Sequence, residues 1–227
     1  MTSRTVSLTR WLEDCTSRFV LLIQNPAGIG FPDTASPSTL NNAIRRSTRV
    51  GDLSRALVEN PYHNSWRSWQ LFADESCTQQ ISCVPVVVDI DNEVQDYADA
   101  YELTRHCLDW IEGAPNRCGF EDLRVIFSGM KGFHIEAKPN QTIDFPSFRA
   151  ALLDGLTSLG LEPLHEGVPN SFRLGTIDLG HDFIRLTDSF NSWIEGGILK
   201  RRKVLQFSLR DFLSFRVQKI LELSEAA

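Results

Sequence analysis

The feature that most constrains the fold is a short apolar run that ends in two aspartates, VPVVVDID at residues 84–91. Its length and its β-branched residues predict a buried strand. Side chains two positions apart on a strand share a face, so Asp89 and Asp91 should converge while Ile90 points into the core. Two carboxylates at a strand end suit Mg²⁺ or Mn²⁺, although a strand that ends in a polar turn has the same pattern.

A second polar constellation, SGMKGFH at residues 128–134, lies between two predicted extended segments, LRVIFSG and KGFHIEA. Glycines let the backbone approach a ligand closely, and the free N–H groups of such a turn bind phosphate oxygens. A hydroxyl, an ammonium and an imidazole accompany them. The candidate phosphate-binding residues are Ser128, Gly129, Lys131, Gly132 and His134. A polar β-turn with a hydrogen-bonded histidine is the structural alternative.

A third signal is Arg185, which interrupts an apolar segment that predicts a strand, FIRLTDSFN at residues 183–191. A buried guanidinium needs an anion, which is either a carboxylate of the protein or a ligand phosphate. One group of basic residues and one group of basic and aromatic residues could each contact a nucleic-acid strand or simply be solvated. They are residues 200–203 and, in the N-terminal part, Arg45, Arg46, Arg49, Trp66, Arg67 and Trp69.

The remaining periodicity predicts helices that alternate with these strands. The expected helices cover residues 5–24, 38–60, 93–112, 144–160 and 207–223, and Ser208 is the expected cap of the last one. Alternating strands and helices indicate an α+β or α/β domain. We expect a mostly helical N-terminal segment, residues 1–80, that packs on a core of residues 81–227 as one structural unit.

Charge and hydropathy argue against several classes of protein. The net charge of −6 disfavours a protein that coats nucleic acid by bulk attraction. No apolar run approaches the ~18 residues of a membrane span, and the charged N-terminus is unlike a signal peptide, so we expect a cytoplasmic protein without a membrane partner. The five cysteines are odd in number and include no CxxC pair, which argues against a disulfide framework and against a zinc site.

Taken in order, the three segments resemble the archaeo-eukaryotic primase superfamily, which includes primase small subunits and primase–polymerases. VVVDID matches the first motif, an apolar strand that ends in DhD or DhE, and SGMKGFH matches the second, SGxxGxH. The third motif, RLPxSxHxxxG in many members, reads RLTDSFN here, with Thr187 in place of the common proline and Asn191 in place of the common histidine. The resemblance covers about residues 84–200.

This resemblance implies an α+β catalytic domain with an RRM-like half and flanking helices. It implies a metal-dependent nucleotidyltransferase, a DNA primase or primase–polymerase, that makes or extends primers from nucleoside triphosphates on single-stranded DNA, with a helicase or accessory replication subunit as a further partner. Two Mg²⁺ or Mn²⁺ ions would be held by Asp89, Asp91 and Asp178, with Asp182 as the alternative third ligand. The nucleotide would be bound by Ser128, Gly129, Lys131, Gly132, His134, Arg185, Ser189 and Asn191.

Two other functions remain open. VVVDIDNEV also resembles the phosphatase motif of haloacid-dehalogenase-like enzymes, in which Asp89 would be a nucleophile that forms an aspartyl-phosphate. Glu93 stands where that motif usually has Thr or Val, and the motif lies deep in the chain rather than at its start. The other possibility is a primase-like subunit that binds nucleotide or nucleic acid without catalysis.

Overall fold

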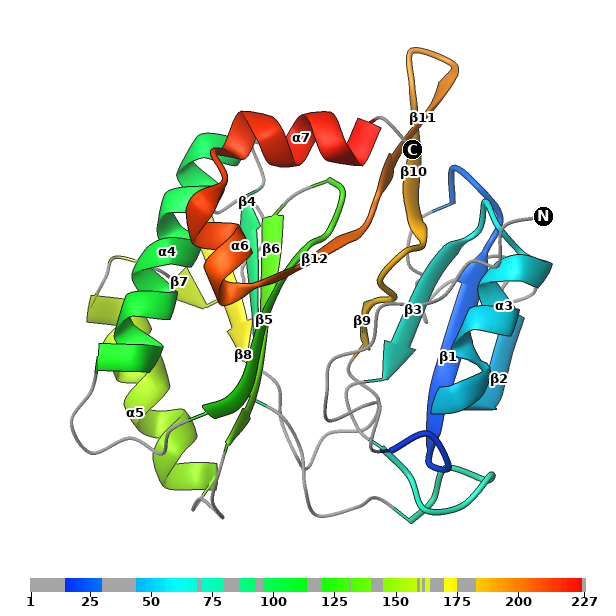
Figure 1. Cartoon of the computed structure of the whole chain (residues 1–227), viewed down its shortest axis with the longest axis horizontal. Coiled ribbons are helices and arrows are strands. Elements are labelled where there is room, and N and C mark those ends of the chain that lie inside the picture. The colour runs from blue at the N-terminus through cyan, green and yellow to red at the C-terminus, as the bar shows by residue number, and fades with distance from the viewer. Residues whose placement is uncertain are drawn as a thin grey trace. The chain divides into compact units, whose positions relative to one another are not determined.

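The computed structural model (Figure 1) describes residues 15–29, 44–68, 71–79, 86–92, 96–113, 120–130, 132–139, 145–158, 160, 162–163, 170–174 and 183–225. Within them the secondary structure is mixed, with two β-sheets and five α-helices, which confirms the predicted α+β class. The chain divides into two compact units. The first unit comprises Met1–Val84, Ile177–Gln206 and Glu222–Ala227, and the second comprises Pro85–Thr176 and Phe207–Leu221.

This division is not the contiguous one that we expected from the sequence. The boundary between Val84 and Pro85 lies near the expected boundary at residue 80. Residues 177–206 and 222–227, which we expected in the core, group with the N-terminal residues instead. The third sequence motif therefore belongs to a different unit from the first two.

The second unit is built on a sheet with the strand order β12-β5-β6-β4-β8-β7. Its strands are β4 (Val86–Asn92), β5 (Phe120–Phe127), β6 (Gly132–Pro139), β7 (Glu162–Pro163), β8 (Asn170–Leu174) and β12 (Leu205–Ser208). The central strand β4 runs antiparallel to both β6 and β8, and β5 runs antiparallel to β6. The strands predicted at residues 84–91, 123–129 and 131–137 are thus confirmed as β4, β5 and β6.

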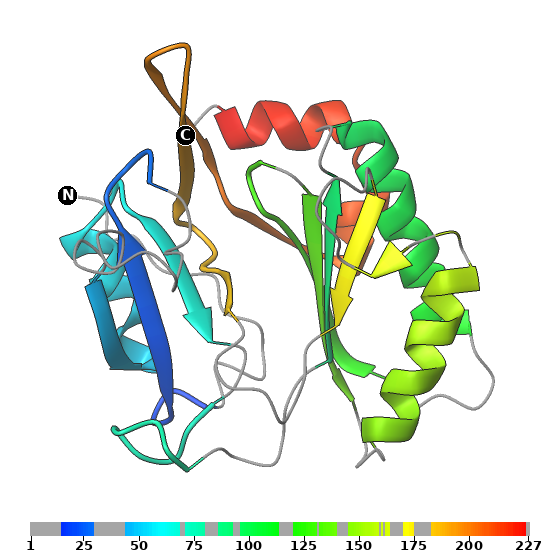
Figure 2. The ribbon, with the colours of Figure 1, turned by 180° about the vertical axis from the view of Figure 1, so that it is seen from behind.

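Helices cover one face of this sheet. They are α4 (Tyr97–Gly113), α5 (Phe145–Ser158), α6 (Leu209–Ser214) and α7 (Val217–Glu225), of which α4 and α5 confirm predicted helices. Figures 1 and 2 show α4 and α5 on the same face, where α4 contacts β4 and β6. The core beneath them is aromatic, since the ring of Phe133 lies 5.3 Å from Phe127 and 5.5 Å from Phe212. None of the helices in the described ranges is long and apolar enough to cross a membrane.

The single helix expected at residues 207–223 is wrong, because the segment contains α6 and α7 with a break between them. At the break, Phe215 has extended backbone angles, and the Tyr101 hydroxyl donates to its carbonyl oxygen at 2.7 Å. A tertiary contact from α4 therefore takes up a carbonyl at the end of α6. The predicted cap is confirmed, since the Asp211 N–H donates to Ser208 Oγ at 3.1 Å.

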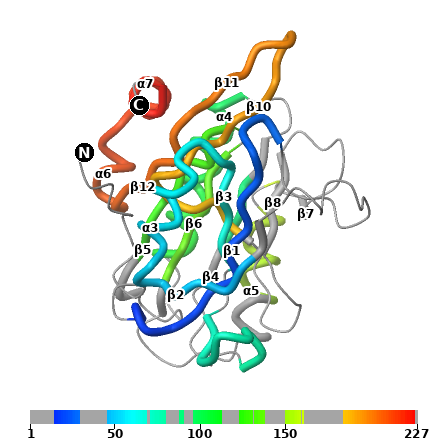
Figure 3. Tube along the Cα trace, turned by 90° about the vertical axis from the view of Figure 1, so that its right-hand side faces the viewer, coloured from blue at the N-terminus to red at the C-terminus, as the bar shows by residue number. Residues whose placement is uncertain are grey.

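The first unit is built on a sheet with the strand order β11-β10-β3-β1-β2, in which β9 also pairs with β3. Its elements are β1 (Phe19–Asn25), β2 (Ile44–Arg49), the 3₁₀ turn η1 (Val50–Asp52), α3 (Leu53–Glu59), β3 (Asn64–Ser68), β9 (Phe183–Arg185), β10 (Phe190–Glu195) and β11 (Ile198–Lys203). Strands β10 and β11 form an edge hairpin, which Figure 3 shows beside β3. The apolar cluster beneath α3 contains Val20, Leu22, Val50, Leu53, Ala56, Leu57, Leu71 and Leu186.

The mostly helical N-terminal segment that we expected is wrong in the described part of residues 1–80. Residues 19–25 form β1 and residues 44–49 form β2, and only α3 confirms part of the helix expected at 38–60. β1 pairs with β2 on one side and with β3 on the other. The local sequence has only a weak preference for helix, and the pairing of β1 with two neighbouring strands outweighs it. Residues 5–14 lie outside the described residues.

Candidate functional site

Antiparallel pairing of β4 with β6 brings the first two sequence motifs together. Asp89 and His134 are direct cross-strand partners in the register. His134 Nε2 lies 3.0 Å from Asp89 Oδ1, and the two side chains are only 7% and 11% exposed. A carboxylate this close to a buried imidazole restrains the orientation of the ring. Two motifs that are distant in the sequence therefore contribute to one buried pair.

The two faces of β6 differ in polarity. Phe133 and Ile135 are fully buried, and Phe133 contacts the helical side of the unit through Tyr101 and Phe212. His134 and Glu136 alternate with them, so they belong to the face opposite the helices. This polar face is buried as well, since His134 is 5% exposed and Glu136 is 1% exposed.

Two arginines extend this polar face in the backbone register. Arg124 of β5 pairs with Glu136, and Arg173 of β8 occupies the register position opposite Asp89. Opposite charges at directly paired positions of adjacent strands are favourable. The sequence analysis missed Arg124, Glu136 and Arg173 as neighbours of the predicted site. The alternation of polar and apolar residues in FHIEA was the signal that could have revealed Glu136.

The second ring nitrogen of His134 distinguishes this pair from an ordinary buried ion pair. His134 Nδ1 is buried and has no hydrogen-bond partner among the residues that the structure describes. Leaving such an atom unsatisfied costs roughly 1–3 kcal/mol, so it calls for an explanation. Because Nε2 faces Asp89, Nδ1 is an acceptor in the neutral ring and a donor in the protonated ring. In the protonated ring, it suits a phosphate oxygen.

In the glycine-flanked turn between β5 and β6, the serine side chain forms hydrogen bonds within the turn itself. Ser128 Oγ donates to the Gly132 carbonyl oxygen at 3.0 Å and accepts from the Gly132 N–H at 3.2 Å. Gly129 has a φ of 82°, in the left-handed region that favours glycine. The hydroxyl proton of Ser128 therefore closes the turn, and any contact of this side chain with phosphate would use the oxygen's remaining lone pair.

Several predicted site residues lie partly or wholly outside the described structure. Asp91 occupies its expected position in β4, paired with Gly132 and Ser171, but its side chain is not described. Lys131, Asp178 and Asp182 lie outside the described residues, so the choice between the two late aspartates stays open.

The carboxylate oxygens of the described site residues are suitable ligands for a divalent cation. Carboxylate oxygens such as those of Asp89 are the ligands that Mg²⁺ prefers, and a second carboxylate follows two positions later in the same strand. No cluster of three His, Cys, Asp or Glu occurs within the described ranges, which exclude the side chain of Asp91. The metal ligands therefore remain a prediction. Cys15, Cys77 and Cys107 are free thiols, and the other two cysteines lie outside those ranges.

The third motif forms a separate arrangement in the first unit. Arg185 pairs in register with Trp66 across β9 and β3, and its guanidinium lies 4.1 Å from the centre of the Trp66 ring. Arg185 Nη2 also donates to Asn191 Oδ1 at 2.9 Å, and Ser189 Oγ donates to the Leu186 carbonyl at 2.6 Å. These contacts of Arg185 are with an aromatic ring and an amide, and the anion that the sequence predicts beside it stays a prediction. Trp66 was missed as its partner because only the strand register reveals it.

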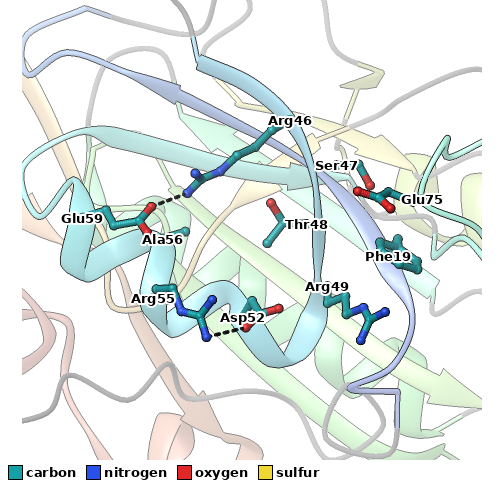
Figure 4. Close-up of a pocket in the computed structure, with 10 residues that line it drawn as sticks. All are labelled: Phe19, Arg46, Ser47, Thr48, Arg49, Asp52, Arg55, Ala56, Glu59 and Glu75. Atoms are coloured by element: carbon teal, nitrogen blue, oxygen red, sulfur yellow. Dashed lines mark hydrogen bonds and ion pairs between the residues drawn. The ribbon is translucent and has the colours of Figure 1, made fainter.

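A cavity of about 310 Å³ lies elsewhere in the first unit, between β2 and α3 (Figure 4). Its lining residues are Phe19, Arg46, Ser47, Thr48, Arg49, Asp52, Arg55, Ala56, Glu59 and Glu75. Arg46 pairs with Glu59 at 3.0 Å and Arg55 pairs with Asp52 at 3.2 Å. Three arginines and three acidic residues balance the charge of the lining. It includes Arg46 and Arg49 of the predicted basic group but none of the predicted metal- or nucleotide-binding residues. The cavity therefore lends no support to phosphate binding there.

Comparison with known proteins adds no relative on which a role could rest. No protein-family model matches the chain, and no curated protein matches its sequence.

Proposed function

We propose that the chain is a metal-dependent nucleotidyltransferase of the primase–polymerase type, with its catalytic carboxylates on β4. The observation that carries this proposal is the close contact between His134 Nε2 and Asp89 Oδ1, which lie 3.0 Å apart on adjacent strands. It joins the acidic pair and the glycine-flanked segment on adjacent strands, as a site that handles metal-bound phosphates requires.

The topology of the second unit supports the same proposal. Its elements follow the order β4-α4-β5-β6-α5-β7-β8. Apart from the two-residue strand β7, the strands lie in the order β5-β6-β4-β8, with antiparallel pairing throughout these four strands. This is the β-α-β-β-α-β arrangement of ferredoxin-like and RRM-like domains. It matches the RRM-like half that the resemblance to primases implies. The acidic pair then lies on the central strand β4, on the face opposite the helices.

Some of these residues would bind the metal ions, and others would bind the phosphates of the nucleotide. Asp89 and Asp91, with Asp178, would hold Mg²⁺ or Mn²⁺, which when bound neutralises phosphate charge and activates the attacking hydroxyl. His134, oriented by Asp89, would bind a phosphate oxygen of the incoming nucleotide. Lys131 and the turn at Gly129 and Gly132 would add charge and close backbone approach. Arg185, Ser189 and Asn191 belong to the first unit, and their roles in nucleotide binding rest on the resemblance to primases.

Primer extension tests this proposal directly. The full chain is mixed with a labelled primer on a DNA template, with nucleoside triphosphates and either Mg²⁺ or Mn²⁺, and incorporation is followed on a gel. Asp89→Asn and Asp91→Asn should each lower the rate about 100- to 1,000-fold, as expected for loss of charge stabilisation in a transition state. Asp109→Asn, at an exposed position of α4, is the matched control and should retain full activity.

The outcome also separates the other two functions. Hydrolysis of a small phosphate ester that is lost in Asp89→Asn, without nucleotide incorporation, would replace the proposal with the dehalogenase-like phosphatase. Binding of nucleotide without either activity would replace it with the non-catalytic primase-like subunit.

A further inference from the structure

The edge hairpin β10–β11 concentrates positive charge in a chain whose net charge is −6. Strand β11 has the sequence ILKRRK and its first four residues are exposed. Two of its four cations have acidic partners. Arg202 lies 2.9 Å from a carboxylate oxygen of Glu225, and Lys203 lies 3.0 Å from one of Asp188.

The other two cations, Lys200 and Arg201, are exposed and pair with no carboxylate among the described residues. Arg201 lies over two aromatic rings, 5.0 Å from the centre of Tyr62 and 5.3 Å from that of Phe190. Tyr62 is 55% exposed, so a large part of this stack faces solvent. A guanidinium on aromatic rings keeps its charge and presents a flat surface on which a base can stack.

The tip of the hairpin is apolar and exposed. Ile194 and Leu199 pair in register and are 64% and 51% exposed, and Arg201 pairs with Ser192 two positions further along. Paired residues share a face, and so do residues two positions apart, so the apolar tip and Arg201 lie on one face. Apolar side chains of this kind insert between bases in several nucleic-acid-binding proteins.

The base of the hairpin is held in place. The Gly28 N–H donates to Ser192 Oγ at 2.9 Å, and Gly28 has a φ of 86°. A Cβ at this glycine would lie 3.1 Å from Ile194 and 3.3 Å from Leu199, which shows how closely the hairpin packs on the turn. The surface is therefore built on a fixed element, which favours a specific binding role.

We propose that Tyr62, Ile194, Leu199 and Arg201 form a surface that binds single-stranded nucleic acid. This inference rests on the proposed function, since it names the surface that holds the template strand. Charge complementarity with phosphates and the exposed aromatic–guanidinium stack favour a nucleic-acid strand over an anionic lipid surface, which has no bases to stack.

Strand binding can be measured without any chemistry. The anisotropy of fluorescent single-stranded DNA and RNA oligonucleotides of equal length is titrated with the full chain. Tyr62→Ala and Arg201→Ala should each weaken binding at least about fivefold. Arg201→Ala should also reduce the slope of log K against log salt by roughly 0.7 units, because one phosphate contact with a single strand is lost.

Arg210→Ala is the matched control, because Arg210 on α6 is exposed and likewise has no acidic partner among the described residues. It should bind the oligonucleotides like the wild type. Equal weakening by this control, or unchanged binding in the two test variants, overturns the proposal. So does binding to anionic vesicles that depends on Arg201 while oligonucleotide binding does not. Asp89→Asn separates the two proposals, since it should abolish incorporation and leave strand binding intact.

Discussion

Two buried polar side chains, one in each sheet, differ in how fully they are hydrogen-bonded. In the first unit, Asn64 at the start of β3 is fully buried, and its side chain contacts three backbone groups. Asn64 Nδ2 donates to the carbonyl oxygens of Ile29 at 2.6 Å and Ser192 at 3.0 Å, and Oδ1 accepts from the Ser192 N–H at 2.7 Å. In the second unit, His134 Nε2 lies 3.0 Å from Asp89 Oδ1, and the buried Nδ1 has no hydrogen-bond partner in the described chain.

The comparison distinguishes a buried polar side chain that the fold alone explains from one that the fold alone does not explain. A fully satisfied buried amide that joins β3, β10 and the turn before Gly30 is explained by the fold itself. A buried imidazole that is satisfied on one side only is not explained in this way, and a ligand is a sufficient reason for it. Four variants test this contrast, beginning with the one of largest expected effect.

Phe133→Ala removes the central ring from the aromatic cluster of the second unit. The residue is fully buried, so we expect the free energy of unfolding to fall by about 3–5 kcal/mol. Urea denaturation followed by tryptophan fluorescence measures this change. Leu213→Ala, at a side chain that is 42% exposed, is the control and should cost far less. Equal costs would mean that the apolar face of the sheet is not the core of this unit.

Asn64→Ala removes the satisfied amide of the first unit. Its partners in the backbone of Ile29 and Ser192 would remain buried, so we expect a loss of about 2–3 kcal/mol in stability. Nucleotide incorporation at a temperature where the variant is folded should stay normal. If incorporation fell while stability did not, Asn64 would belong to a site and the contrast between the two sheets would break.

His134→Gln tests the unsatisfied nitrogen by itself. Glutamine keeps a donor near the position of Nε2, so its bond to Asp89 can persist, but nothing replaces Nδ1. We expect KM for the nucleotide to rise about tenfold with little change in kcat, as for the loss of one phosphate contact. Steady-state kinetics and a denaturation curve are measured on the same preparation. A variant that loses stability with an unchanged KM would show the pair to be structural.

Ser208→Ala measures how much a polar contact at the surface contributes to stability, for comparison with the buried contacts of Asn64. Losing the bond from the Asp211 N–H should cost about 1 kcal/mol, as is typical of helix caps. Ser214→Ala, near the other end of the same helix, is the comparison and should cost less. A cost above that of Asn64→Ala would mean that burial adds nothing to the value of the Asn64 network.

The second unit was largely predictable from the sequence because its elements follow one another along the chain. The apolar run before Asp89 and the alternation around His134 specify paired strands, and the helix between β4 and β5 has clear periodicity. The first unit was not predictable in the same way. Its central strand β3 depends on β9 and β10, which arrive more than a hundred residues later, and no local pattern encodes that pairing.

The same limit applied to the candidate site. Asp89 and His134 were identified because strand alternation alone places each of them on the polar face. The partner of Arg185 was not identified, because Trp66 reaches it only through the register of β3 with β9. Ser128 was expected to bind phosphate, and its use in closing the turn depends on a local geometry that residue types do not specify.

The late arrival of β10 has a consequence for how the protein is made. Asn64 and Ser192 are separated by 128 residues, which a ribosome adds in roughly ten seconds. During that interval β3 has been synthesised but lacks the strands that complete one of its edges, whereas residues 85–176 of the second unit emerge as one continuous stretch. The nascent chain therefore carries an open strand edge while residues 85–176 are synthesised, and an interruption of synthesis before residue 190 would leave that edge available to other chains.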